Sequence, residues 1–365
     1  MRKSSFLSVP FIACVMAFSQ SVLADRLKQE AIKQPGLEHA LLLSVTNAGS
    51  RLVASGEHGV IIFSDDAGVS WQQASVPIST LITDLHFFDN QIGWAVGHDG
   101  LIMRSIDSGV SWEKVLDGNN LNALRVKQLE NYLSQLQKNP DVDSDLLETV
   151  EYQLDDASVA SEEGPTAPLL DVLFVNSDKG FVLGAYGLLL VTDDGGKQWR
   201  YIGHKLPNPD GLHLNKLHLT QKGELLILGE AGLVMLSRDL GESWVALDSP
   251  YDGSFFSVAE SDSLYLMGLR GNVFKLQLPD ALAEGNAIWE KVALQTTATI
   301  NDAVVVENKA YLVGQGGALL QQSGDTFRLY GERGLRSYSA VTAVGDYLIT
   351  VGEAGVNRIS LVGGQ

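Results

Sequence analysis

Seven pairs of glycines separated by two residues, each between two apolar or alternating segments, recur along this chain of 365 residues. The pairs begin at Gly56, Gly97, Gly184, Gly229, Gly268, Gly314 and Gly352, and they end at Gly59, Gly100, Gly187, Gly232, Gly271, Gly317 and Gly355. Their first glycines are 41, 87, 45, 39, 46 and 38 residues apart. A period of about 40–45 residues is typical of one supersecondary unit repeated in tandem. The 87-residue interval indicates one unit with an insertion.

Each glycine pair lies between two apolar or alternating segments, for example residues 52–55 and 60–63 around the first pair. Two such segments joined by a short glycine-containing loop are typical of a β-hairpin. Glycine adopts positive φ without steric cost, so we expect it at both ends of each four-residue turn for that reason.

A second motif, Ser/Thr-x-Asp-x-Gly-x-x-Trp, follows four of the glycine pairs. Its copies are Ser64, Asp66, Gly68 and Trp71; Ser105, Asp107, Gly109 and Trp112; Thr192, Asp194, Gly196 and Trp199; and Ser237, Asp239, Gly241 and Trp244. This is the Asp-box of bacterial neuraminidase-type (BNR) repeats. We expect its aspartate to accept hydrogen bonds from amides of its own turn and its tryptophan to pack an outer strand against a neighbour. The boxes are predicted to fold hairpins and to perform no chemistry.

Each unit reads as four short antiparallel strands, at 84–88, 93–97, 101–105 and 111–115 in the second unit. Seven such units predict an all-β fold, a seven-bladed β-propeller, which leaves only short, protected strand edges. The last unit supplies three evident strands, at 339–344, 347–351 and 356–361. We therefore expect an N-terminal strand near residues 27–32 to close the last blade.

Residues 118–165 have a helical rather than a strand period and lie between blades 2 and 3. Their apolar positions form two stripes: Leu121, Leu124, Leu129, Tyr132, Leu133 and Leu136, and then Leu146, Leu147, Val150 and Leu154. We expect a helical hairpin in which Pro140 ends the first helix, and Asp145 and Glu148 form the capping box of the second. Asp141, Asp143 and Asp145 have the spacing of a calcium loop, but its glycine and final glutamate are missing, so helix capping is the preferred interpretation.

The first 24 residues are typical of a cleaved secretory signal peptide: Arg2 and Lys3 precede an apolar stretch that ends near Ala24. We therefore expect a periplasmic protein whose propeller comprises residues 25–365. Cys14, the one cysteine, makes a lipoprotein a less favoured alternative. Without it the remaining chain could form no disulfide and no cysteine-ligated metal site.

The composition is acidic, with a net charge of −18 that becomes −20 once the two signal-peptide cations are removed. Such a surface disfavours nucleic acid and anionic lipid as partners, because both are bound through clustered Lys and Arg. No later stretch has the 18 or more apolar residues needed to span a bilayer. We expect no direct insertion into the membrane.

In a propeller the link between blades emerges on the same face as the turn between strands two and three. The helical hairpin should therefore share one face with the glycine turns. The candidate binding face consists of the turn residues Glu57, His58, His98, Asp99, Tyr186, Glu230, Arg270, Gln315 and Glu353. The inner strands begin at this face with Asp84, Asp171, Asn215 and Asp302. These four side chains either bond backbone amides at the channel mouth or take part in binding.

His58, His98 and Asp99 come from adjacent blades and have the chemistry of a divalent-metal site. Solvated turn residues are the preferred interpretation, because no fixed spacing on one element supports a metal. His86 and His218 lie in strand-like segments and are expected to be structural. We predict no cofactor, no metal and no catalytic residue.

Glycine pairs followed by Asp-boxes over residues 38–362, apart from the insertion, resemble the photosystem II assembly and stability factor family. The resemblance implies a seven-bladed, non-catalytic scaffold that acts on membrane-protein assembly. Relatives in non-phototrophs resemble accessories of inner-membrane exporters of the RND type, which makes such an exporter the implied partner. The family's photosystem-binding members use arginines just after the third strand, where this chain has Arg104 and Arg358 but otherwise Phe63, Val191, Leu236 and Lys275.

Two other functions stay open at this point. A sialidase would also be a propeller with Asp-boxes, but it needs three arginines from separate blades, whereas Arg328, Arg333 and Arg336 lie in one short segment. A propeller that binds a small molecule or an ion at its acidic channel mouth is the second alternative. The sequence leaves the oligomeric state undetermined.

Overall fold

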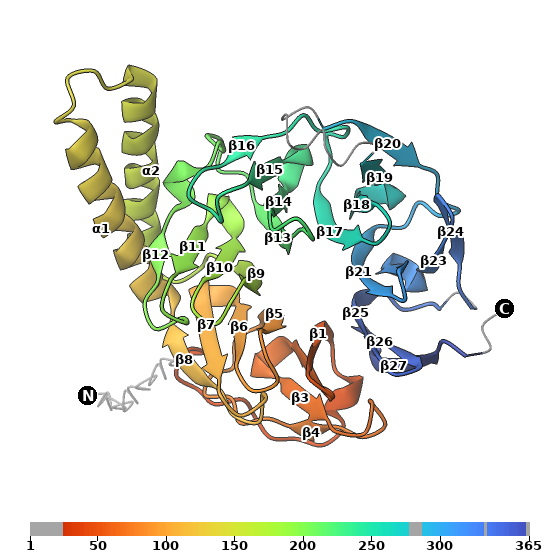
Figure 1. Ribbon diagram of the computed structural model, residues 1–365. Helices are drawn as coiled ribbons and strands as arrows, with labels where there is room; N and C mark the ends of the chain where they lie inside the picture. Colours follow the sequence, from red (N-terminus) through yellow and green to blue (C-terminus); the bar gives the residue numbers. More distant parts are fainter. Residues whose placement is uncertain (1–24, 277–286, 332–333, 363–365) are drawn as a thin grey trace, which may run out of the picture.

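The computed structural model describes residues 25–276, 287–331 and 334–362. Its strands form seven antiparallel sheets, arranged as the blades of one ring (Figure 1). The inner strands of all seven blades contact one another in sequence, and the inner strand of the last blade contacts that of the first. The seven-bladed propeller is thus confirmed. The predicted signal peptide, with Cys14, lies outside the described residues.

Six blades have four strands and the seventh has three. Blade 1 contains β1 (Leu42–Ala48), β2 (Arg51–Gly56), β3 (Ile61–Ser64) and β4 (Gln72–Gln73); blade 2 contains β5 (Ile82–Phe87), β6 (Gly93–Gly97), β7 (Leu101–Ser105) and β8 (Glu113–Leu116); blade 3 contains β9 (Leu169–Phe174), β10 (Gly180–Gly184), β11 (Leu189–Thr192) and β12 (Arg200–Tyr201). Blade 4 contains β13 (Leu214–Leu219), β14 (Leu225–Gly229), β15 (Val234–Ser237) and β16 (Val245–Ala246); blade 5 contains β17 (Phe255–Glu260), β18 (Leu264–Gly268), β19 (Val273–Leu276) and β20 (Trp289–Val292). Blade 6 contains β21 (Ile300–Val306), β22 (Lys309–Gly314), β23 (Leu319–Ser323) and β24 (Thr326–Leu329); blade 7 contains β25 (Tyr338–Val344), β26 (Tyr347–Gly352) and β27 (Gly355–Ser360).

The two glycines of each pair are required for different physical reasons. Positive φ was predicted for both, and only the second glycine has it. Gly59 has a φ of +74°, whereas Gly56 has a φ of −170°, which is extended backbone. A Cβ on Gly56 would lie 2.1 Å from the carbonyl oxygen of Leu41, just before the inner strand of the same blade. The equivalent clash is with a carbonyl oxygen at 2.0–2.4 Å in every blade. The first glycine is therefore required for close backbone approach, not for positive φ.

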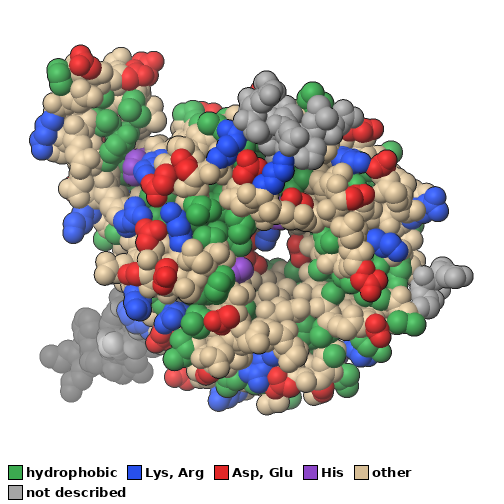
Figure 2. Space-filling view, viewed as in Figure 1, with side chains coloured by type: hydrophobic (Ala, Val, Ile, Leu, Met, Phe, Trp, Pro, Cys, Tyr) green, Lys and Arg blue, Asp and Glu red, His purple; other side chains and the backbone are tan. Residues whose placement is uncertain are grey.

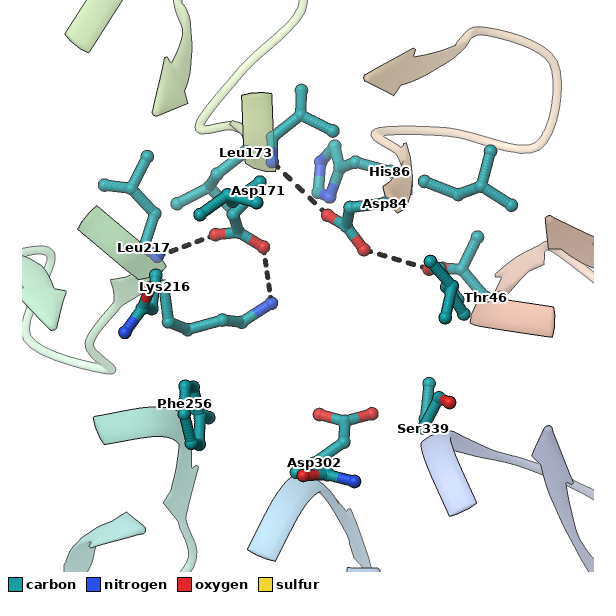
Figure 3. Close-up of a pocket in the computed structure, with 18 of the residues that line it drawn as sticks. Thr46, Asp84, His86, Asp171, Leu173, Lys216, Leu217, Phe256, Asp302 and Ser339 are labelled. Carbon is teal, nitrogen blue, oxygen red and sulfur yellow. Dashed lines mark hydrogen bonds and ion pairs between the residues drawn. The ribbon is translucent and has the colours of Figure 1, made fainter. Parts of the chain in front are cut away.

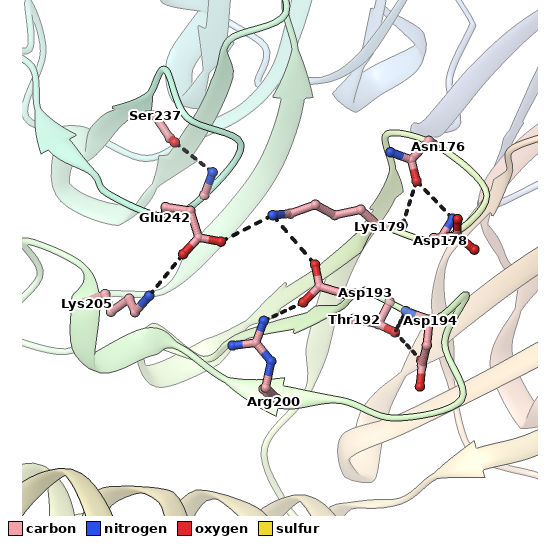
Figure 4. Close-up of polar contacts among 11 residues, drawn as sticks. Asn176, Asp178, Lys179, Thr192, Asp193, Asp194, Arg200, Lys205, Ser237 and Glu242 are labelled. Carbon is pink, nitrogen blue, oxygen red and sulfur yellow. Dashed lines mark hydrogen bonds and ion pairs between the residues drawn. The ribbon is translucent and has the colours of Figure 1, made fainter.

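The Asp-boxes fold as expected, and blade 3 illustrates them (Figure 4). Asp194 accepts hydrogen bonds from the Thr192 hydroxyl (2.9 Å), the Gln198 amide (2.9 Å) and the Lys197 amide (3.0 Å). The Gln198 amide and the other donors hold the pKa of Asp194 below its usual range, because they stabilise the charged carboxylate. In the other three boxes the aspartate also accepts a hydrogen bond from the hydroxyl of the first motif residue and one from the backbone amide four residues after the aspartate.

The tryptophans of the boxes seal the contacts between neighbouring blades. Trp112 packs in an apolar cluster shared by blades 1 and 2, Trp199 in one shared by blades 2 and 3, and Trp244 in one shared by blades 3 and 4. Trp71 packs against the cluster that joins blade 7 to blade 1. The predicted packing role is confirmed, and the hydrophobic core consists of a series of layers between blades.

The prediction of an N-terminal strand in the last blade is wrong. Residues 27–32 form no strand, and blade 7 is the three-stranded sheet β25–β26–β27. The segment runs instead across blades 1 and 2: the Ala31 amide donates to the Val76 carbonyl (3.1 Å), and the Ser79 amide donates to the Arg26 carbonyl (2.9 Å). Leu27, 6% exposed, is buried in the cluster of these two blades. The segment therefore buries Leu27 between blades 1 and 2 instead of pairing with the free edge of β27.

The insertion forms the predicted helical hairpin, α1 (Gly118–Leu136) and α2 (Ser144–Glu163). The capping box was misplaced, because α2 is capped by Asp143, which accepts from the Asp145 amide (3.0 Å). The preferred interpretation of this acidic run, helix capping, is nevertheless confirmed. Asp117 caps α1 by accepting from the Asn120 amide (3.2 Å). Neither helix, nor any other in the described part of the chain, is long and apolar enough to cross a membrane.

The box aspartates should contribute to stability in a way that neighbouring surface aspartates do not. Asp194→Ala removes an acceptor of three hydrogen bonds and should lower the free energy of unfolding by about 2 kcal/mol at pH 7. Asp193→Ala is the matched control: Asp193 is 50% exposed and pairs with Arg200, so the loss should be about 0–1 kcal/mol. Urea unfolding measures both.

The effect of Asp194→Ala should also depend on pH. The folded pKa of Asp194 is depressed below 3.8, so its charge stabilises the fold above that pH and the contribution is lost as pH falls through the folded pKa. The two variants should therefore converge in stability in strong acid. Equal losses at pH 7 would contradict the role given to the box.

The N-terminal segment should stabilise the ring through Leu27. Leu27→Ala should lower the free energy of unfolding by about 2–3 kcal/mol, because the side chain is buried between blades 1 and 2. Ile32→Ala, in the same segment but 68% exposed, should change it by less than about 0.5 kcal/mol. If both variants unfold at the same urea concentration as the parent, the segment does not contribute to the stability of the ring.

Candidate functional site

The glycine turns and the helical hairpin lie on one face, as predicted. A Cβ on Gly100, in the turn of blade 2, would lie 2.5 Å from Gly118 at the start of α1, and the Gly100 amide donates to the Ala167 carbonyl after α2 (3.0 Å). The positions of the nine predicted face residues within their turns are also as expected: Glu57, His58, His98, Asp99, Tyr186, Glu230, Arg270, Gln315 and Glu353 all follow the second strand of a blade.

Asp99 is not available on this face, in contrast to the prediction. It is 7% exposed, and its carboxylate accepts hydrogen bonds from Arg26 (3.1 Å) and the Thr80 hydroxyl (2.7 Å). It therefore fastens the N-terminal segment to blade 2. His58 is solvated, with its side chain 82% exposed and its imidazole 3.9 Å from Glu57. Within the described ranges, no three His, Cys, Asp or Glu side chains are grouped as a metal site requires.

The other face residues differ in how free they are. Tyr186 is 58% exposed and stacks edge-on against His213, with ring centroids 4.9 Å apart. Glu230 is engaged by the same histidine, 3.4 Å from its Nδ1. Glu353 accepts from the Ser337 amide (3.2 Å), while Arg270 and Gln315 are exposed. Tyr186 is thus the large apolar side chain that this set presents to a partner.

The helical hairpin stands at the outer edge of the ring rather than over its centre (Figure 1). Leu129 and Val150 are buried in the cluster of blades 2 and 3, and the Gln128 side chain accepts from the Tyr201 amide of β12 (2.6 Å). The far ends of α1 and α2 point away from the ring. Tyr152 on α2 is 64% exposed, so the hairpin adds a second aromatic surface.

The centre of the ring is hollow and polar (Figure 2). A cavity of about 390 Å³ is lined by the inner strands, with Asp84, Asp171 and Asp302 facing it (Figure 3). Each carboxylate accepts a hydrogen bond from a backbone amide of the next blade: Asp84 from Val172 (3.3 Å), Asp171 from Leu217 (2.6 Å) and Asp302 from Val341 (2.9 Å). The Asn215 side-chain amide instead donates to the Phe255 carbonyl (2.9 Å). The three aspartates thus bond backbone amides as predicted.

Lys216, which the sequence analysis missed, partly compensates the charge of the channel carboxylates. Its ammonium lies 2.6 Å from Asp171, whose side chain is 3% exposed. Burial opposes the charge, but Asp171, Asp84 and Asp302 together raise the pKa of Lys216, so it stays protonated. Burial raises the pKa of Asp302. The arrangement is a belt around the channel in which one ammonium partly compensates three carboxylates and links blades.

The two strand histidines differ. His218 lies 3.0 Å from Glu260 and is satisfied, as expected of a structural histidine. His86 lines the channel, burial lowers its pKa to about 4, and its Nε2 has no hydrogen-bond partner within the described residues.

The sequence carried a signal for one of the two buried cations but not for the other. Nothing local marks Lys216, because its partner Asp171 lies 45 residues away on the preceding blade. Arg125 stands between Leu121 and Leu129 at a spacing of four residues, which places a cation in the apolar stripe of α1. A charge in such a stripe is buried and needs a partner.

Removing the central cation should destabilise the ring. Lys216→Met leaves three carboxylates around the channel without their counter-charge, and should lower the free energy of unfolding by about 3 kcal/mol at pH 7. Acidification should reduce the loss, because carboxylates with raised pKa values then take up protons in the folded state. Lys275→Met is the control: its partner Asp325 is 82% exposed, so about 0–1 kcal/mol is expected. Equal effects would contradict the belt.

Two curated proteins resemble this chain. The photosystem II assembly lipoprotein Ycf48 of Synechococcus sp. (strain CC9902) is 27% identical over 151 residues, which are 40% of this chain and 43% of that protein. The chloroplastic photosystem II stability/assembly factor HCF136 of Arabidopsis thaliana is 26% identical over 197 residues, or 51% of this chain and 44% of that protein. The chain thus spans less than half the length of either relative.

Two solved structures have a similar fold. One, described as YCF48 bound to D1 peptide, has a TM-score of 0.61 and 15% identity, and covers 92% of this chain and 98% of its own. The other is YCF48 from Cyanidioschyzon merolae, with a TM-score of 0.61 and 12% identity over 90% of this chain and 96% of its own. At these identities the likeness concerns the fold alone.

The profile of one protein family matches this chain over residues 40–132 and 157–262, which leaves out residues 133–156 within the helical hairpin. The match spans more than half of the 365 residues and includes all four Asp-boxes. This protein therefore belongs to the family described as photosynthesis system II assembly factor YCF48.

Proposed function

We propose that this protein is a non-catalytic scaffold that binds a membrane-protein complex during assembly. The observation that carries the proposal is membership of an assembly-factor family, matched over the Asp-box blades. A solved member of the fold is described as bound to a peptide, so a propeller of this shape can present a peptide-binding surface.

The surface proposed for the partner combines the glycine-turn face of blade 3 with α2. It carries two exposed aromatic side chains, Tyr186 (58%) and Tyr152 (64%). Exposed tyrosines are frequent energetic anchors of protein interfaces, because they bury a large area at a low entropic cost. Tyr152 lies within residues 133–156 of the hairpin, which the family profile omits, so this part of the hairpin is suited to a partner particular to this protein.

The compartment and the partner class are further parts of the proposal. We place the protein in the periplasm on the basis of residues 1–24, and the partner class is an inner-membrane exporter of the RND type, on the basis of the family resemblance. Lys/Arg and Asp/Glu side chains are interspersed on the face seen in Figure 2. Arg358, at one of the two predicted arginine positions, packs on Tyr347 and donates to the Ala67 carbonyl (3.0 Å). A photosystem partner is therefore not proposed.

The sialidase alternative has no support in the described arginines. Arg328 lies on β24, the outer strand of blade 6, and Arg336 lies in the link that leads to β25 of blade 7, and neither of them lines the central channel. Arg333 lies outside the described residues. The cation facing the channel is Lys216, which is already paired with Asp171.

Exchanging the two aromatic anchors should reduce partner capture. Crosslinking pull-down from native membranes, quantified by mass spectrometry, should recover the partner at least 10-fold less with Tyr152→Ser/Tyr186→Ser than with the parent, because each anchor contributes about 1–2 kcal/mol. A double substitution is preferable to deletion of residues 119–158, because Leu129 and Val150 of the hairpin are buried against the blades.

The matched control is Val69→Ser/Ile106→Ser. These side chains are 68% and 64% exposed but lie in Asp-box loops, at the opposite ends of the blades. They should leave capture unchanged. Recovery of the same partner by the tyrosine variant at the parent level, or an equal loss in the control, would show that the interface lies elsewhere.

A further inference from the structure

A second cavity, of about 430 Å³, lies where the helical hairpin meets blade 3. Its lining comes from α1, α2, the glycine turn after β10 and the loop that follows β12. Asn122 holds the two helices together at this point by donating to the carbonyls of Ala160 (2.8 Å) and Gly164 (3.2 Å). The cavity is therefore framed by a fixed helix pair on one side and by the propeller on the other.

Arg125 of α1 lines this cavity and is 7% exposed. Its guanidinium carbon lies 5.6 Å from the centre of the Tyr201 ring. Within the part of the chain that the structure describes, it forms no ion pair and its Nε has no hydrogen-bond partner, while its side chain also hydrogen-bonds the Tyr201 hydroxyl. A buried guanidinium cannot lose its proton and is costly without a counter-charge. It therefore presents donors to the cavity that an anion can satisfy.

The remaining polar groups of the cavity restrict which anion fits. The Gln153 Oε1 is a buried acceptor without a partner, so it can receive an N–H group of a ligand. Asp156, Glu163 and Asp210 also line the cavity and are exposed. Arg125 is the one cation among the lining residues. A doubly charged phosphate would be repelled by these carboxylates, whereas a planar monoanion with a positive charge nearby would be complementary to the whole set.

We propose that this cavity binds a carboxylate that carries a cationic group beside it, either a free basic amino acid or the basic C-terminal residue of a polypeptide. Arg125 binds the carboxylate, Gln153 accepts an N–H, and the three exposed carboxylates attract the cation. Tyr186 (58% exposed) and Val159 (54% exposed) supply an apolar wall for the carbon chain. The cavity has the size typical of sites for small ligands.

Calorimetry with defined probes tests the proposal. The probes are L-lysine, the tripeptide Gly-Gly-Lys with a free C-terminus, and the same tripeptide amidated. Binding of the free tripeptide assigns a polypeptide C-terminus as the source, and binding of lysine alone assigns the free amino acid. Amidation should weaken tripeptide binding at least 10-fold, because it removes the charge that Arg125 recognises.

Variants separate ligand binding from a purely structural role of Arg125. Arg125→Met keeps the apolar packing on Tyr201 and should lower the affinity at least 10-fold. Asp156→Asn/Glu163→Gln should weaken the lysine-containing probes but not a further probe, Gly-Gly-Ala, which lacks the cationic side chain next to the carboxylate. If Arg125→Met does not fold, Gln153→Leu should lower the affinity of the same probes. Absence of binding by both carboxylate probes at millimolar concentration, or binding unaffected by Arg125→Met or by amidation, overturns the proposal.

Where the carboxylate belongs to a partner's C-terminus, this site deepens the proposed function and rests on it. The two can fail separately. Loss of probe binding with normal partner capture would refute the cavity alone, and normal probe binding with no partner recovered from membranes would refute the scaffold function alone.

Discussion

Close backbone approach at the top of each blade is the constraint on which this fold depends. The residue after the first glycine donates its amide to the carbonyl that precedes the inner strand, as in His98 to Leu81 (2.9 Å) and Gln315 to Thr299 (2.9 Å). A side chain at the first glycine would collide with that same carbonyl. The glycine thus allows one hydrogen bond per blade that fixes where the inner strand begins, and hence which residues face the channel.

Closure of the ring relies on lateral bonds between inner strands rather than on a shared strand. Asn47 of β1 donates to the Ala343 carbonyl of β25 (2.9 Å), across the junction between the first and last blades. Apolar packing continues across the same junction, where Leu42 and Ile349 belong to one cluster. Arg358 on β27 donates to the carbonyl of Ala67 in the Asp-box of blade 1. The last blade is therefore held without a fourth strand, and the N-terminal segment can serve blades 1 and 2.

Local patterns could be read from the sequence, and choices between distant partners could not. The Asp-boxes, the strands of blade 2 and the two helices follow from spacing within a few residues. The destination of residues 27–32 did not, because both the open edge of blade 7 and the surface of blades 1 and 2 were compatible with the same short apolar segment. Asp99 was misjudged for the same reason: a turn aspartate reads as solvated until Arg26, 73 residues away, is found to pair with it.

Lys216 and Arg125 are both removed from solvent to some extent, and the charges around each of them indicate whether its role is structural or in binding. Lys216 lies among three carboxylates, so the folded chain itself compensates its charge. Arg125 is more completely covered, with 7% exposure, yet the described residues supply it with an aromatic ring and no ion pair. A cation–π contact replaces only part of the hydration that a guanidinium loses on burial. The family profile covers Arg125 but omits residues 133–156, which contribute Gln153 and Asp156 to the same cavity, so the α2 side of the cavity is where ligand preference can change without disturbing the ring.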